Sequence, residues 1–333
     1  NNYVPVLQNP VFFIGLGVFG LGFTVLVIRG LFFSNPVGQS SSGGGAIRFG
    51  LFTALVAALV SLLALVASWF GIPGHAQGEY FFELLFWGSG HTLQFVHVQL
   101  VLVVWLCLAV IIGVELKITP RIVSFIFAIG LLPVLVTPIV YLMFDVSSGN
   151  HLQAITWLMQ YGGGLAALPI GLAIIYSLFT NSSGFPQASG ERNALIFSFL
   201  LFAAGGVIGF MISGSNTIVP AHYHGSITAI TLAFMGITYH LLPRLGFKKP
   251  TGKMVRWQPV FYGIGQLIHI GGLAWSGGHG VQRKTAGAAQ GLDTMEKIVG
   301  MRIVGVGAGI AIIGGIIFLI IVFKSMMSAR TKD

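Results

Sequence analysis

Residues 219–243 read VPAHYHGSITAITLAFMGITYHLLP and contain no lysine, arginine, aspartate or glutamate. The segment exceeds the roughly 20 apolar residues that an α-helix needs to cross the hydrocarbon core of a bilayer. Eight further stretches are comparably long and apolar. The sequence therefore predicts a polytopic all-α membrane bundle with nine transmembrane helices, at 11–33, 47–70, 79–113, 120–144, 151–179, 194–213, 219–243, 257–276 and 300–324.

The composition of the whole chain agrees with this expectation. Of the 333 residues, 55% are hydrophobic and 8% are charged, and the mean hydropathy is +0.89, whereas a soluble domain has about 25% charged residues. The linkers between the spans are short and no repeat is evident, so we expect a single integral membrane domain over residues 1–333. The one cysteine, Cys107, lies in an apolar span, which excludes a disulfide framework and a cysteine-based metal site.

The formal net charge of +9 is explained by topology rather than by nucleic-acid binding. When nine helices alternate in direction, 13 of the 17 lysines and arginines fall on one side of the membrane. By the positive-inside rule, this distribution predicts a cytoplasmic C-terminus and an N-terminus on the outer face. We expect a multi-pass protein of a prokaryotic (inner) cell membrane without a nucleic-acid partner. The four basic residues on the other side are Arg283, Lys284, Lys297 and Arg302.

Few ionisable side chains lie in the predicted spans. Each costs roughly 2.5–3.5 kcal/mol to insert, so each requires a partner or a function. His222 and His224 are two residues apart on one helix and point about 200° away from each other, so they cannot bind the same ion. They can hold two separate haem irons, because imidazole is a common axial ligand; alternatively, both are hydrogen-bonded core histidines. The remaining ionisable residues in or beside spans are Glu83, His91, His97, Asp145, His151, His240 and His269.

Four stretches resemble, in order and in separation, the catalytic subunit of the haem-copper oxidases and nitric oxide reductases. The resemblance covers essentially the whole chain and aligns the nine spans with helices four to twelve of that family. The stretches are residues 219–224 (VPAHYH) with 233–236 (AFMG) and 241–246 (LLPRLG) for the tenth helix, 87–91 (WGSGH) for the sixth, 137–138 (TP) for the seventh, and 280–284 (GVQRK) for the loop between the eleventh and twelfth.

This resemblance implies a set of cofactors and partners. His222 would bind a high-spin haem, His224 a low-spin haem and His91 a non-haem metal, while Arg283 and Lys284 would pair with haem propionates. Family helices one to three are absent from these residues, and helix two normally supplies the second axial ligand of the low-spin haem. We therefore expect a companion membrane subunit that provides it, or else a longer chain or the loss of that haem. Cytochrome c, a cupredoxin or quinol would donate electrons.

The non-haem metal site departs from the family pattern. Oxygen reductases have two adjacent histidines after the Thr-Pro pair, and here Leu142 and Met143 take their places. A tyrosine is expected one turn after the first metal histidine, and Phe95 takes its place. Oxygen reduction with copper and that phenol is therefore doubtful.

Replacement ligands are available close by in the sequence. Asp145 and His151 could join His91, and a carboxylate with imidazoles favours non-haem iron over copper. Alternatively, Asp145 is a helix cap and His151 a solvated residue. Glu83, two turns before His91, would suit a proton relay or a structural hydrogen bond.

Three functions follow in order of preference. The first is a terminal reductase that converts nitric oxide to nitrous oxide at a high-spin haem and non-haem metal centre. The second is an oxygen-reducing oxidase that pumps protons, and the third is a haem-bearing electron-transfer or scaffold subunit without chemistry of its own. A transporter would not explain the pair His222 and His224. Iron in excess of haem would indicate the first function, copper the second, and haem alone the third.

Overall fold

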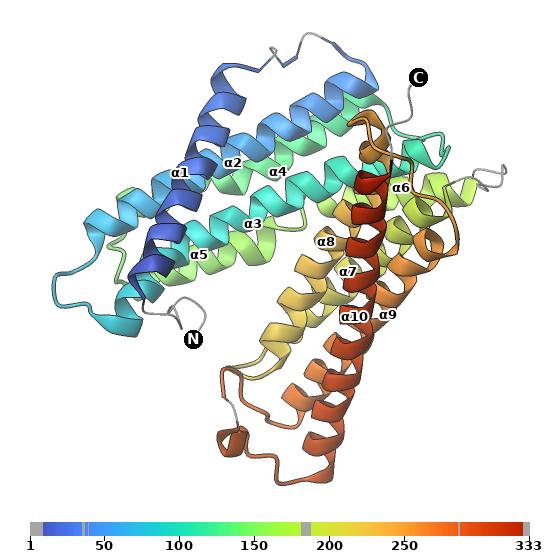
Figure 1. The fold of residues 1–333 in the computed structure, drawn as a ribbon. Helices are drawn as coiled ribbons and strands as arrows, with labels where there is room; N and C mark the ends of the chain where they lie inside the picture. The colour runs from blue at the N-terminus through green and yellow to red at the C-terminus, as the bar shows by residue number, and fades with distance from the viewer. Residues whose placement is uncertain (1–8, 35–36, 39, 181–187, 286, 329–333) are drawn as a thin grey trace. The chain divides into compact units, whose positions relative to one another are not determined.

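The regular secondary structure is entirely helical in the part of the chain that the computed structural model describes, residues 9–34, 37–38, 40–180, 188–285 and 287–328 (Figure 1). Two basic residues of the charge pattern, Arg330 and Lys332, and the turn predicted at 181–184 lie outside these residues. The described chain divides into two compact units. The first contains the residues up to Val103 and those from Lys117 to Tyr176, and the second contains the rest.

The first unit consists of α1 (Pro10–Phe32), α2 (Gly43–Gly71), most of α3 (Gly78–Ile111), α4 (Pro120–Met143), α5 (Gly149–Gly162) and most of α6 (Ala167–Thr180). Helix α2 packs against α1 and α4, and α4 packs against α5. Their common core contains the buried side chains of Ala57, Phe95 and Val134. The membrane-length helices of this unit therefore bury small and medium apolar side chains against one another.

Polar residues mark the starts of four of these helices. Each accepts a hydrogen bond from a backbone N–H group in the first helical turn, which satisfies a donor that the helix itself leaves unpaired. Two of them are followed directly by proline, a residue suited to the first helical position. The capping residues are Asn9, Ser42, Thr119 and Ser148.

The second unit consists of the last turns of α3 and α6, α7 (Ser189–Phe210), α8 (Ile218–Arg244), α9 (Lys253–Gly278), the 3-10 helix η1 (Gly287–Gln290) and α10 (Met295–Met327). Helices α7, α8 and α9 pack on one another, and α10 packs along α9. Small residues bring the backbones of α9 and α10 close together: a Cβ atom added at Gly272 would lie 2.7 Å from the backbone nitrogen of Val304. Such close approach is typical of helix packing in membranes.

The predicted spans agree with the helices, with two differences. The span predicted at 151–179 is two helices, α5 and α6, separated at 163–166, where glycines weaken the helix. Eight helical segments are long and apolar enough to cross a membrane when α5 and α6 count as one, and α9, at the span predicted for 257–276, does not reach that composition. Polar residues lower its hydropathy; one of them, Gln258, is buried and accepts a hydrogen bond from Tyr239 at 2.7 Å. The chain is thus a multi-pass helical membrane protein.

Candidate functional site

His222 lies in the second turn of α8, half-buried in the second unit. Its Nδ1 atom lies 2.7 Å from the backbone carbonyl oxygen of Gly205 on α7. A carbonyl oxygen can only accept, so Nδ1 carries the hydrogen and Nε2 is left with a free lone pair. A metal-binding histidine typically has this arrangement, in which the second nitrogen is held by a hydrogen bond that fixes the tautomer and the ring.

Glycines on α7 make room for the His222 ring. A Cβ atom added at Gly209 would lie 2.6 Å from Nδ1 of His222, and one added at Gly205 would lie 2.7 Å from the backbone nitrogen of Ser226. Only the missing side chains allow α7 to approach α8 this closely. The position of the imidazole therefore depends on two helices, not on α8 alone.

His224 is also half-buried, and within the described residues no hydrogen bond reaches its ring. The ring stacks on Tyr223 at 5.1 Å between centroids and meets the edge of His269 on α9 at 5.0 Å. Nδ1 of His269 donates to the carbonyl oxygen of Val304 on α10 at 3.1 Å, so its Nε2 is free as well. The sequence suggested only a core histidine at 269, because no spacing rule links it to His224. The structure brings the two together.

The basic pair lies at the end of the second unit where α8 begins. A β-bridge joins Asn216 to Gln282, and the Thr217 N–H donates to the carbonyl oxygen of Val281 at 3.0 Å. Next to this bridge, Nε of Arg283 donates to Ser215 Oγ at 3.1 Å. Lys284 has a φ angle of 62°, a left-handed backbone conformation that non-glycine residues rarely adopt. The loop is thus tied to the same helix end that carries His222.

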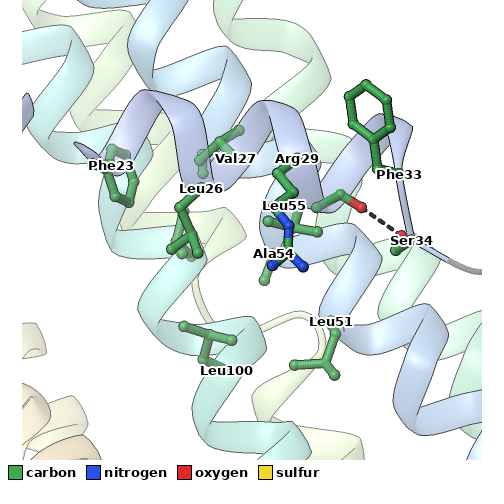
Figure 2. A pocket seen from close by; sticks show the side chains of 13 residues that line it. Phe23, Leu26, Val27, Arg29, Phe33, Ser34, Leu51, Ala54, Leu55 and Leu100 are labelled. Carbon is green, nitrogen blue, oxygen red and sulfur yellow. Dashed lines mark hydrogen bonds between the residues drawn. The ribbon is translucent and has the colours of Figure 1, made fainter. Parts of the chain in front are cut away.

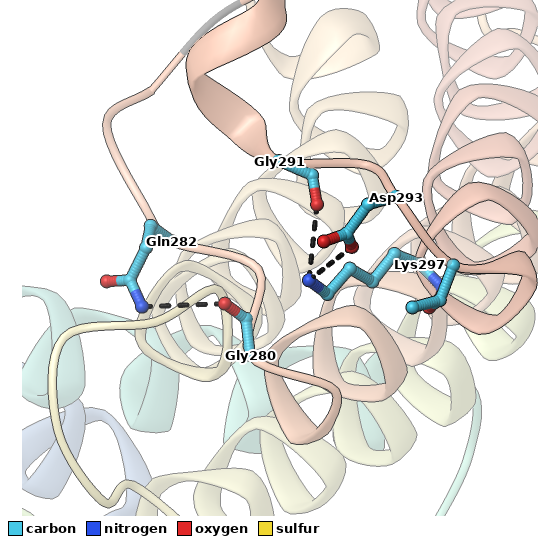
Figure 3. A network of polar contacts seen from close by, with 6 residues as sticks. Gly280, Gln282, Gly291, Asp293 and Lys297 are labelled. Atoms are coloured by element: carbon cyan, nitrogen blue, oxygen red, sulfur yellow. Dashed lines mark hydrogen bonds and ion pairs between the residues drawn. The ribbon is translucent and has the colours of Figure 1, made fainter.

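An ion pair closes the far side of this loop. Lys297 Nζ donates to the Asp293 carboxylate at 2.7 Å and to the Gly291 carbonyl oxygen at 3.2 Å (Figure 3). The hydrogen bond from Lys297 lowers the pKa of the exposed Asp293 carboxyl below its usual value. Because the pair is exposed, it adds little to the stability of the fold. Its role is local, at the start of α10.

His91 lies on α3 in the first unit. Its Nδ1 atom lies 2.7 Å from the carbonyl oxygen of Trp87, one turn earlier on the same helix. By the same reasoning as for His222, Nε2 of His91 has a free lone pair. The Trp87 ring contacts the His91 ring at 4.6 Å, and its Nε1 donates to the carbonyl oxygen of Leu152 on α5 at 3.3 Å. Trp87 therefore links the His91 region to the beginning of α5.

His151 lies in the first turn of α5 and is completely buried. Neither of its ring nitrogens has a hydrogen-bond partner within the described residues. A buried polar group without a partner costs about 1–3 kcal/mol. The Tyr141 ring meets the His151 ring edge-on at 4.7 Å. The alternative that His151 is a solvated residue is therefore wrong.

The three predicted metal ligands do not form one cluster. Asp145, in the turn between α4 and α5, is exposed, whereas His151 is buried. No group of three or more histidine, cysteine, aspartate or glutamate side chains could hold a metal ion in the described part of the chain. Glu83 lies on α3 two turns before His91 and is half-buried. Ligation by Asp145 and a relay through Glu83 stay predictions.

One groove lies apart from these histidines, in the first unit beside α1, α2 and α3 (Figure 2). It has a volume of about 420 Å³. Leucine, phenylalanine and valine side chains line it, and Arg29 is its only charged side chain. It holds no group that could take part in the chemistry of the histidines.

Comparisons with known proteins bear on the fold. No protein-family model matches the chain. It is 29% identical to an uncharacterized protein of Rickettsia prowazekii over 98% of this chain and 71% of that protein. It is 31% identical to an uncharacterized protein of Aquifex aeolicus over 78% of this chain and 63% of that protein.

A solved structure supports the architecture. The structure is a haem-copper terminal oxidase dimer determined by cryo-electron microscopy, and the TM-score to one of its chains is 0.60. The match has 15% sequence identity and covers 86% of this chain and 57% of that chain, so the chain spans little more than half of the oxidase polypeptide. This likeness confirms the predicted fold class: the chain is a polytopic helical membrane protein with the fold of a haem-copper terminal oxidase.

Proposed function

We propose that this chain is the haem-binding subunit of a respiratory terminal reductase in a prokaryotic cell membrane. The observation that carries the proposal is the geometry of His222, whose Nδ1–H is held by the Gly205 carbonyl while Nε2 stays free for a metal. A core histidine without a ligand would normally use both nitrogens. When bound, a haem iron with one open position would supply the binding and reduction of a small diatomic molecule.

A second haem would use His224, and its opposite ligand would come from outside these 333 residues. The contact of His224 with His269 at 5.0 Å leaves no room for a macrocycle between these two imidazoles. His269 is therefore not the opposite axial ligand in this arrangement. A companion membrane subunit, or a further helix of a longer chain, would provide it. Cytochrome c, a cupredoxin or quinol would deliver the electrons.

The basic pair would hold the carboxylates of a haem. Arg283 is oriented by Ser215, and its loop is joined to the start of α8 by the bridge between Asn216 and Gln282. A guanidinium group pairs well with carboxylates. The positive loop would thus position the haem at the end of α8 that carries His222.

Reduction of nitric oxide to nitrous oxide is the preferred reaction. Two nitric oxide molecules, two electrons and two protons give one nitrous oxide and one water, and no phenol is needed. Phe95 is buried in the core and offers no such group. Leu142 and Met143 are exposed and cannot stand in as metal ligands. Oxygen reduction is the second candidate, because Tyr141 places a phenol beside the buried His151.

Substitution of the two histidines tests the haem assignment. His222→Ala should remove the high-spin haem signal and His224→Ala the low-spin signal, each measured by optical and electron paramagnetic resonance (EPR) spectroscopy of the purified protein. The exposed His75 is the matched control, and His75→Ala should keep both signals. Both signals intact in the His222 and His224 variants would overturn the proposal.

Metal analysis and gas consumption test the reaction. We expect iron in excess of haem, little copper, and consumption of nitric oxide with release of nitrous oxide. Stoichiometric copper together with oxygen consumption would favour the second candidate. Haem without any other metal and without turnover would favour an electron-transfer or scaffold subunit.

A further inference from the structure

His151 has a completely enclosed side chain that lacks any partner for either ring nitrogen within the described residues. A neutral imidazole has one N–H donor and one acceptor nitrogen, so both functions are unsatisfied. Proteins satisfy nearly all buried polar groups, and the exceptions indicate a place for a water, an ion or a ligand. The His151 ring therefore requires a further group.

The surroundings of His151 hold its ring in place without satisfying it. The Tyr141 ring lies edge-on at 4.7 Å, and its hydroxyl is hydrogen-bonded to Ser68 Oγ on α2 at 2.7 Å. Gly88 on α3 leaves the space for that hydroxyl, because a Cβ atom there would collide with it. Three helices therefore fix Tyr141, and Tyr141 fixes one side of the imidazole.

His91 belongs to the same region of the first unit. Trp87 contacts the His91 ring and donates to the carbonyl oxygen of Leu152, the residue that follows His151. Nε2 of His91 is free, as are both nitrogens of His151. The carboxylate of Asp145, by contrast, is exposed at the end of α4.

We propose that His151, and not Asp145, is the second protein ligand of the non-haem metal, and that Tyr141 positions it. This inference rests on the proposed function, in which His91 is the first ligand. The ligand set would consist of two imidazoles beside a phenol oxygen and would contain no carboxylate. Imidazole ligands suit copper, iron and zinc alike, so the preference for iron that a carboxylate would bring is lost.

Copper titration of the full chain, purified with its companion polypeptides and freed of non-haem metal by chelation, tests the ligand assignment. Cu²⁺ is the probe because it binds nitrogen sites most tightly among the divalent first-row metals. We expect one tight site per chain, with nitrogen hyperfine splitting in the EPR spectrum. His151→Gln should weaken it by at least about 10-fold, the loss that even outer-shell substitutions cause. Asp145→Asn and the surface control His75→Gln should leave it unchanged.

A second variant separates metal binding from misfolding. His151→Phe keeps a planar ring but removes two unpaired nitrogens, so the metal-free protein should melt at a higher temperature than the wild type. The rise in melting temperature that Cu²⁺ causes in the wild type should disappear in this variant. A lower melting temperature of metal-free His151→Phe would show that the nitrogens have partners, and would overturn the inference.

Other outcomes of the copper experiment also decide. Loss of the site in Asp145→Asn, its survival in His151→Gln, or no tight site in the wild type would each overturn the inference. The haem signals of His222 and His224 should stay intact in all these variants, because those residues belong to the second unit. Failure of the proposed function would instead appear as missing haem in the wild type.

Discussion

At the scale of single residues, two histidines reach the same state by different routes. His91 is held by a carbonyl oxygen of its own helix, one turn earlier, whereas His222 is held by Gly205 on another helix. The orientation of His91 is therefore a local property of α3. The orientation of His222 depends on how closely α7 approaches α8, and so on the glycines of α7.

A methyl group on α7 should disturb the His222 haem. In Gly209→Ala the new Cβ atom would lie 2.6 Å from Nδ1 of His222, so the ring must rotate or the helices must separate. We expect a shifted and weakened high-spin haem spectrum and a melting temperature several degrees lower. Gly206→Ala is the matched control, because its Cβ atom would meet nothing within 4 Å. Equal spectra for both variants would show that Gly209 does not position the ring.

At the scale of helices, the end of α4 and the start of α5 bring Tyr141 and His151 together. Tyr141 lies in the last turn of α4. Ser148 accepts a hydrogen bond from the backbone N–H of His151, so α5 begins at a fixed residue. The short turn between the helices leaves Asp145 exposed while it directs His151 inward. Helix capping thus decides which of the two predicted ligands is buried.

Contact between α3 and α4 should be sensitive to one methyl group at Gly88. Gly88→Ala should lower the melting temperature, because the new Cβ atom would collide with the Tyr141 hydroxyl that Ser68 holds. Combined with Tyr141→Phe, the same substitution should cost less, since the colliding oxygen is gone. Melting curves of the two single variants and the double variant measure this coupling. Strictly additive effects would contradict the predicted collision.

At the scale of the whole molecule, the chain is a series of membrane-length helices with asymmetric charge. Thirteen of the 17 basic residues fall on the side predicted to be cytoplasmic. The loop after α8 contains Lys248 and Lys249, whereas the loop before α10 contains the ion pair of Asp293 with Lys297. Charge counting and helix order therefore place these two loops on opposite faces of the membrane.

Cysteine labelling tests this orientation. In a Cys107→Ala background, Asp293→Cys should react with a membrane-impermeant thiol reagent added to intact cells, because its loop lies outside. Lys249→Cys should react only after the membrane is opened. Both positions are exposed, so a difference in labelling reports the membrane side and not burial. The reverse pattern would contradict the predicted topology.

The sequence by itself determined the fold class, most helix positions and the roles expected of His222, His224 and His91. It did so because apolar length and rare buried histidines are properties of the chain that need no tertiary information. Only the tertiary structure decided that Gly205 holds His222, that His269 lies against His224, and that His151 is buried while Asp145 is exposed. These facts depend on contacts between residues distant in sequence, which no local pattern records.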